Sequence, residues 1–318
     1  MKHKLSITLI LLGMFLVTQF IGLFVVNAYA STTESILNPE TGEIELRVIE
    51  NKLPFGLQSP EDDPMANFFS IVFAFIFAFA LIFILMKYKW KFIIKTWFFF
   101  VITLALGISI SAFLDNSIQN ASLIALAIAL PLTYLKIFKS NVFTHNITEL
   151  LIYPGIAAVF VPILTPISII ALLILISIYD MWAVWKSGIM QKIAKFQMEE
   201  LRIFGGFLIP SVSDKVKKQI KKIKQKYKNK KMPKKVKGKK FKVSLAILGG
   251  GDVIFPIITA GVFMRAYNII PSLFIIAGAL AGLTFLFSQT RKGKSYPAMP
   301  YISVGIFIGL IIWKIFVA

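Results

Sequence analysis

Nine apolar segments, each about twenty residues long, dominate this chain and restrict what it can fold into. About 20 consecutive apolar residues cross a bilayer core of roughly 30 Å as a helix, and runs of that length mark membrane spans. The chain as a whole is 57% hydrophobic. The sequence therefore predicts an all-α polytopic membrane protein with nine transmembrane helices, at about 5–29, 66–86, 92–114, 121–138, 145–164, 166–186, 243–263, 271–289 and 297–316.

The charges of the loops favour one orientation. Cytoplasmic loops of membrane proteins carry an excess of Lys and Arg. Here the basic residues before the first span and in every second loop fall on one side, and the acidic segment 31–65 falls on the other. We therefore expect a cytoplasmic N-terminus and an extracytoplasmic C-terminus, in the plasma membrane of a prokaryote.

The first apolar segment has two interpretations. The residues Ala28-Tyr29-Ala30 match the small-x-small pattern of a signal-peptide cleavage site, so residues 1–30 are a candidate signal peptide. A signal peptide usually has an apolar part of about 7–15 residues, and this one is longer than twenty, so we favour a retained anchor. Cleavage would leave eight spans in the same orientation.

The spans group into three regions. Residues 1–186 form a bundle of six spans, 187–242 a basic cytoplasmic loop, and 243–318 a bundle of three. From Lys186 to Lys242 the chain has 20 Lys or Arg and three acids. Between 214 and 242 apolar residues recur at helical spacing (Val216, Ile220, Ile223, Tyr227), which favours an amphipathic helix on anionic lipid headgroups. A solvated loop without a specific partner fits equally well. With only two aromatic residues in its basic part, Tyr227 and Phe241, and no known motif, the loop is not expected to bind nucleic acid.

Two acids lie inside predicted spans, where ionisable residues are rare and mark functional sites. Asp180 comes six residues before Lys186, about 9 Å deep in a helix, and Asp252 comes ten residues after Lys242, about 15 Å deep. Two neighbouring carboxylates cannot both ionise easily, so such a pair holds one proton near neutral pH and can hydrolyse an amide by general acid-base catalysis. Either residue alone can instead cap a helix or pair with a lysine, and the pair also suits a proton or cation relay in a transporter.

The backbone around Asp252 is weakened on both sides. Gly249, Gly250 and Gly251 precede it and leave the chain uncovered, so that another chain can approach closely. Pro256 lacks the N–H that would bond the carbonyl of Asp252. Lipid tolerates such freed backbone groups only where protein or a water-filled cavity supplies partners. The segment therefore predicts a wet site within the membrane.

Three separated motifs resemble the presenilin and signal peptide peptidase family of intramembrane aspartyl proteases. Tyr179-Asp180 matches Y-D in the sixth span, the glycines with Asp252 match G-x-G-D in the seventh, and Pro297-Ala298-Met299 stands where the family has P-A-L, at the start of the ninth. Met299 replaces a leucine of similar volume. The resemblance implies that Asp180 and Asp252 are the catalytic pair and that Pro297, Ala298 and Met299 shape the site and contact substrate. The expected orientation resembles that of presenilin.

The resemblance implies single-span or signal-peptide-like membrane substrates. A helical substrate must unwind before water can attack, and pairing the unwound segment as an added strand offsets its lost hydrogen bonds. We expect the backbone near 249–251 and 297–299 to offer that edge. Tyr179 either forms a hydrogen bond nearby or is an interfacial aromatic residue. The sequence leaves the oligomeric state open.

Other chemistries lack the residues they need. The chain has two histidines, His3 and His145, and no cysteine, so an H-E-x-x-H zinc site cannot be built, and no metal or cofactor is expected. No G-x-S-x-G motif occurs, and His145 is expected to be an interfacial residue at the start of the fifth span. Two non-proteolytic hypotheses remain: a transporter or channel using the Asp pair, and a scaffold acting through its basic loop.

Overall fold

The computed structural model describes most of the apolar chain. The described residues are 5–30, 32–37, 44–49, 53–56, 64–88, 90–114, 118, 120–139, 141–187, 196–201, 203–211, 244–290 and 296–317. The predicted amphipathic helix within 214–242 lies outside them.

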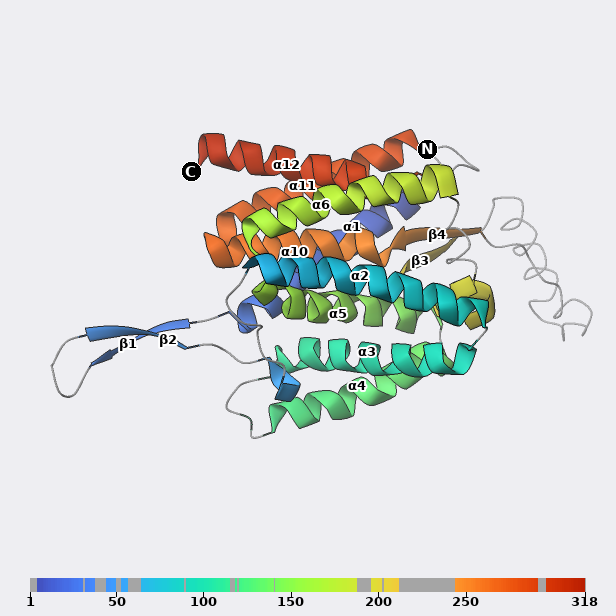
Figure 1. The fold of residues 1–318 in the computed structure, drawn as a ribbon, viewed down its shortest axis with the longest axis horizontal. Helices are drawn as coiled ribbons and strands as arrows, with labels where there is room; N and C mark the ends of the chain where they lie inside the picture. Colours follow the sequence, from blue (N-terminus) through green and yellow to red (C-terminus); the bar gives the residue numbers. More distant parts are fainter. Residues whose placement is uncertain are drawn as a thin grey trace, which may run out of the picture.

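Long helices form one bundle in which they run side by side along a common direction (Figure 1). In the described residues they are α1 (Leu5–Ala28), α2 (Pro64–Lys87), α3 (Lys91–Ser111), α4 (Ala121–Phe138), α5 (Val142–Phe160), α6 (Pro166–Trp182), α10 (Gly250–Ala266), α11 (Ile269–Gln289) and α12 (Met299–Phe316). Short helical turns cover Pro54–Gly56, Val161–Ile163, Ala183–Ser187 and Phe196–Leu201. Eight helices of the described chain are long and apolar enough to cross a membrane; α10, with 17 residues, is shorter. The coarse prediction of a polytopic helical protein is therefore confirmed.

The prediction of an all-α chain is wrong at two strand pairs. β1 (Thr32–Leu37) pairs with β2 (Ile44–Ile49), and β3 (Gly206–Ser211) pairs with β4 (Ser244–Gly249), both antiparallel. The predicted seventh span, 243–263, thus begins as a strand and becomes helical only at Gly250. Apolarity alone does not distinguish a buried strand from a buried helix. Figure 1 shows the two strand pairs at opposite ends of the bundle, with β4 leading directly into α10.

Helices α11 and α12 approach each other at glycines. A Cβ atom built on Gly278 would lie 2.1 Å from the carbonyl oxygen of Gly305, and one on Gly282 would lie 2.3 Å from that of Tyr301. Side chains at these positions would force the helices apart, so the glycines set how close α12 lies to α11. This packing places the start of α12, which carries the Pro297-Ala298-Met299 motif, within the bundle.

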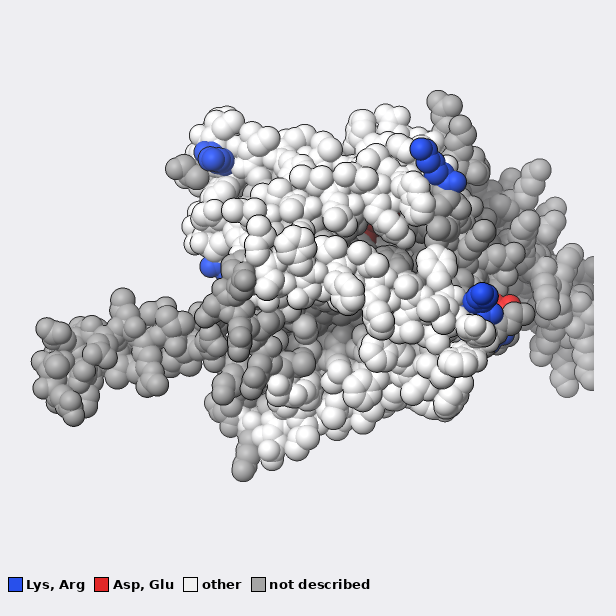
Figure 2. All heavy atoms as spheres, viewed as in Figure 1, with Lys and Arg blue, Asp and Glu red and all other residues white. Residues whose placement is uncertain are grey.

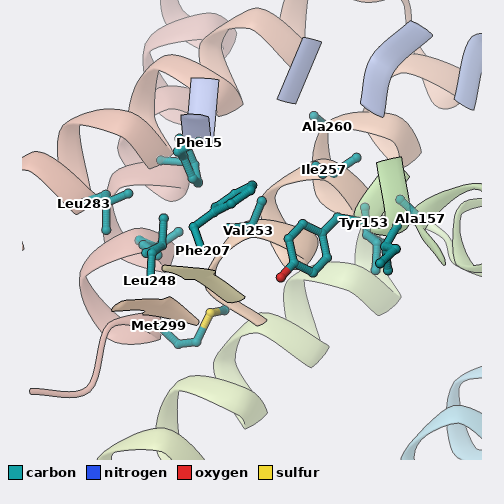
Figure 3. Packing of buried hydrophobic residues seen from close by; sticks show 14 of the residues in the cluster. Phe15, Tyr153, Ala157, Phe207, Leu248, Val253, Ile257, Ala260, Leu283 and Met299 are labelled. Carbon is teal, nitrogen blue, oxygen red and sulfur yellow. The ribbon is translucent and has the colours of Figure 1, made fainter. Parts of the chain in front are cut away.

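The interior and the exterior of the bundle are both apolar. Buried side chains from α1, α5, the strand pair and α10 meet at the centre, including Phe15, Tyr153, Phe207 and Ile257 (Figure 3). The outer surface carries many exposed large apolar side chains, such as Phe73, Phe77 and Ile315. Figure 2 shows the visible lysines and arginines near the ends of the bundle and a mostly uncharged surface between them. An apolar exterior of this kind suits a lipid environment.

Candidate active site

Asp180 lies near the C-terminal end of α6 and is held by the beginning of α12. Its side chain is 5% exposed. The backbone N–H of Met299 donates to Oδ2 of Asp180 at 3.1 Å. The first N–H groups of a helix have no partner within the helix, and they lie at its partially positive end. Asp180 therefore receives a hydrogen bond of the kind that stabilises a carboxylate removed from water.

Asp252 lies in the first turn of α10 and is held by its own helix. Gly249 is the N-cap of this helix and Asp252 is its third residue, so the acid lies at the partially positive end of the helix. A Cβ atom on Gly249 would lie 3.0 Å from Oδ2 of Asp252, so a side chain here would crowd the acid. The fold thus orients Asp252 through local geometry.

The two acids come from neighbouring helices, because α6 and α10 pack together. The start of α12 connects them: Met299 donates its N–H to Asp180, and Ala298, the residue before it, lines a cavity of about 130 Å³ together with Asp252. Strand β4 contributes Ile247 and Leu248 to the same cavity. This is space for a few water molecules beside a carboxyl group, as hydrolysis requires.

The three glycines before Asp252 have different surroundings. A side chain on Gly249 would crowd Asp252. Gly250 lies against the ring of Tyr153, and a Cβ atom on Gly250 would be 2.9 Å from the phenol oxygen. A Cβ atom on Gly251 would meet only Phe255, at 3.9 Å, and Gly251 is exposed. Gly249 and Gly250 are thus in close contact with side chains of this protein, and Gly251 borders open space; that the three glycines let another chain approach stays a prediction.

The remaining predicted residues lie around the acids. Pro297 and Met299 are buried, and Met299 belongs to the central apolar cluster (Figure 3). Pro297 also borders a larger apolar groove of about 910 Å³ along α11 and α12. Tyr179 is partly buried, and its ring lies 6.3 Å from that of Trp182, centre to centre. Whether Tyr179 serves the site or an interface stays a prediction.

Sequence reasoning missed a group of polar residues on α4 and α5. Glu149 lies in the fifth span with 1% of its surface exposed, so it is a third intramembrane acid, and it pairs with the buried Lys136. The interpretation of His145 as an interfacial residue is wrong, because it is 4% exposed and hydrogen-bonded within the protein. The spacing of His145, Glu149 and Tyr153, four residues apart on one helix face, was the available signal.

Comparisons with known proteins identify the family of this chain. Residues 46–318 match the family model described as signal-peptide peptidase, presenilin aspartyl protease, so the chain belongs to that family. Two solved structures of a presenilin family intramembrane aspartate protease, in the C222 and P2 space groups, have similar folds. The first is 18% identical with a TM-score of 0.57, covering 97% of this chain and 98% of that one. The second is 17% identical with a TM-score of 0.59, covering 96% of each. A search of curated proteins found no match.

Family membership and the apolar helices define the class of protein. It is an integral, multi-pass membrane protein and an aspartic-type intramembrane endopeptidase, whose substrates are membrane proteins in the lipid bilayer.

Proposed function

We propose that Asp180 and Asp252 are the catalytic pair of this protease and that they hydrolyse peptide bonds within transmembrane segments of single-span or signal-peptide-like proteins. The observation that carries the proposal is the start of α12, where Met299 donates its N–H to Asp180 and the preceding residue, Ala298, lines the cavity that contains Asp252.

The proposed reaction needs one proton shared by the two carboxyl groups. The ionised carboxylate takes a proton from water as the water oxygen bonds to the peptide carbon, and the protonated partner donates to the carbonyl oxygen. The resulting tetrahedral diol collapses when the carboxyl group that took the proton from water passes it to the nitrogen and one diol hydroxyl gives its proton to the other carboxylate. The C–N bond then breaks, and the pair again holds one proton. The pair titrates as a unit, so neither aspartate is assigned the acid or the base role.

We further propose that the substrate pairs with β4 as an added strand. Ile247 is 38% exposed and borders the cavity that contains Asp252. The described strands pair only in twos, so β4 has one edge without a strand partner. An extended substrate on that edge would have its backbone bonded next to the acids, and the open space beside Gly251 would admit it. Pro297, Ala298 and Met299 would then border the substrate from the other side.

The number of membrane spans and their orientation are also proposals. With α10 counted as a span, the described helices would make nine crossings, and the ends of the chain would lie on opposite sides of the membrane. The loop charges favour a cytoplasmic N-terminus and a prokaryotic plasma membrane. In this topology 1–186 and 243–318 are the two membrane regions. Residues 187–242 join them on the cytoplasmic side, with β3 packed against the bundle, and the basic part 214–242 has affinity for anionic headgroups. No described feature favours transport over proteolysis.

The test uses the purified full-length protein in detergent with a single-span substrate. Asp180→Asn and Asp252→Asn each keep the size of the side chain but remove the exchangeable carboxyl proton, so each is expected to abolish cleavage. The control is Glu200→Gln, which removes an exposed carboxylate paired with Lys91 and should cleave like the wild type. Cleavage that persists in either aspartate variant contradicts the proposed mechanism.

A further inference from the structure

One edge of β3 is already occupied by a side chain of α5. The amide group of Asn146 donates from Nδ2 to the carbonyl oxygen of Leu208 at 2.8 Å and accepts at Oδ1 from the N–H of Leu208 at 3.0 Å. A residue of a neighbouring strand would make the same two bonds. Asn146 therefore imitates a strand partner at the centre of β3.

A second side chain of α5 binds the same strand at Gly206. Nε2 of His145 lies 2.7 Å from the carbonyl oxygen of Gly206, while Nδ1 lies 3.3 Å from Nζ of Lys136. A carbonyl only accepts and a lysine ammonium only donates, so His145 is neutral with its proton on Nε2. Glu149 bonds Lys136 at 2.5 Å and balances its charge. The histidine is thus fixed as the tautomer whose Nε2–H donates to the carbonyl oxygen of Gly206.

The register of β3 and β4 shows that both contacts fall on the outer edge. The N–H and C=O groups of one residue point to one side of a strand, and those of the next residue point to the other. Since both groups of Leu208 bond Asn146, positions 206, 208 and 210 face away from β4. Position 210 is a proline, which lacks an N–H and is tolerated at such an edge. Phe207 and Ile209 then face their β4 partners, Leu248 and Ala246.

We propose that His145 and Asn146, supported by Lys136 and Glu149, form a strand clamp that positions the β3–β4 pair for proteolysis and excludes an added strand from β3. This inference rests on the proposed function. The clamp closes the outer edge of β3, so an incoming extended segment can pair only with β4, whose residues 247 and 248 border the cavity of Asp252. The clamp residues are positioning residues: they act on the reaction through the strands.

The clamp predicts the exchange behaviour of the Leu208 amide. An N–H on the outer edge of a two-stranded sheet is unprotected unless a side chain binds it. Losing a hydrogen bond to a buried backbone group corresponds to about a 5- to 50-fold change in an equilibrium constant. Replacing Asn146 is therefore expected to speed amide exchange in 203–211 by about that factor. Freed from the clamp, the strand pair also shifts relative to Asp252, so cleavage spreads over more positions of the substrate.

The experiment compares Asn146→Asp and Asn146→Ala with wild type and with a matched control. Asn146→Asp keeps the shape of the side chain but replaces the donor to Leu208 by an oxygen, so an effect of this variant reports the hydrogen bond and not the packing. The control is Asn268→Ala, which removes an asparagine that caps α11 through one bond to the N–H of Ile270. Amide exchange is measured by mass spectrometry on peptides from 203–211, and cleavage positions are mapped on a single-span substrate.

Both Asn146 variants should exchange faster in 203–211 and cleave at more positions, with the Asn268 variant unchanged in both respects. Unchanged exchange in the Asn146 variants overturns the clamp, whether or not the protein cleaves. Faster exchange with an unchanged cleavage pattern and rate overturns its role in directing substrate. If wild type cleaves no tested substrate, the proposed function fails, and the exchange measurement alone decides whether the clamp exists.

Discussion

Alanine substitutions at Gly250 and Gly251 are expected to change stability in opposite directions. A Cβ atom on Gly250 would lie 2.9 Å from the phenol oxygen and 3.0 Å from a ring carbon of Tyr153. That ring has little room to move, because it is 3% exposed and packs edge to face on Phe207 at 5.7 Å. Overpacking of this kind costs about 1–3 kcal/mol, and the better helix propensity of alanine offsets at most about 1 kcal/mol.

The net expectation is a loss of about 1–2 kcal/mol for Gly250→Ala and a gain of up to about 1 kcal/mol for Gly251→Ala. Both residues have backbone angles that alanine can adopt, and a Cβ atom on Gly251 would have its nearest neighbour 3.9 Å away. Thermal unfolding in detergent measures the difference, at roughly 2–4 °C per kcal/mol. Cleavage should fall in Gly250→Ala, because the clash displaces the turn that carries Asp252.

A double variant isolates the cause of this effect. If the clash with Tyr153 destabilises Gly250→Ala, then Gly250→Ala should cost less in a Tyr153→Leu background, with a coupling of at least about 1 kcal/mol. The reasoning is refuted if Gly250→Ala is as stable as Gly251→Ala, or if the cost of Gly250→Ala is the same with leucine at position 153.

Three further substitutions test the packing around the site. Met299→Leu keeps the volume of a buried side chain and the backbone N–H that binds Asp180, so the cleavage rate should stay within a factor of a few, whereas a loss of cleavage would show that the thioether itself matters. Lys136→Met leaves the carboxylate of Glu149 buried and unpaired and should lower the free energy of unfolding by about 3–5 kcal/mol, measured by thermal unfolding. The double variant Lys136→Met with Glu149→Leu should recover most of this loss. If the single and the double variant lose the same stability, the ion pair is not the cause. Gly305→Ala places a Cβ atom 2.1 Å from a carbonyl oxygen of α11 and should lower the unfolding temperature by several degrees. The control Gly13→Ala, whose Cβ atom would have no neighbour within 4 Å, should not lower it. Equal unfolding temperatures of the two variants would show that α12 can move away from α11.

Much of the helical fold could be predicted because its signals are local. Apolar runs such as 5–29 and 271–289 became α1 and α11 to within two residues, since lipid requires a chain to satisfy its own backbone within each span. Asp180 and Asp252 could be singled out for the same reason: an acid in an apolar run needs a special environment wherever its partners lie.

The sequence by itself determined which segments are apolar enough to cross a membrane, which family the chain resembles and which two acids were candidates, because each of these depends on neighbouring residues. Only the tertiary structure decided that 244–249 is a strand, since its partner β3 lies more than thirty residues earlier in the chain. It also decided that Met299 binds Asp180, that Gly250 contacts Tyr153, and that His145 and Asn146 bind β3. These contacts join residues distant in the chain, and the free energy of each depends on a geometry that no local pattern contains.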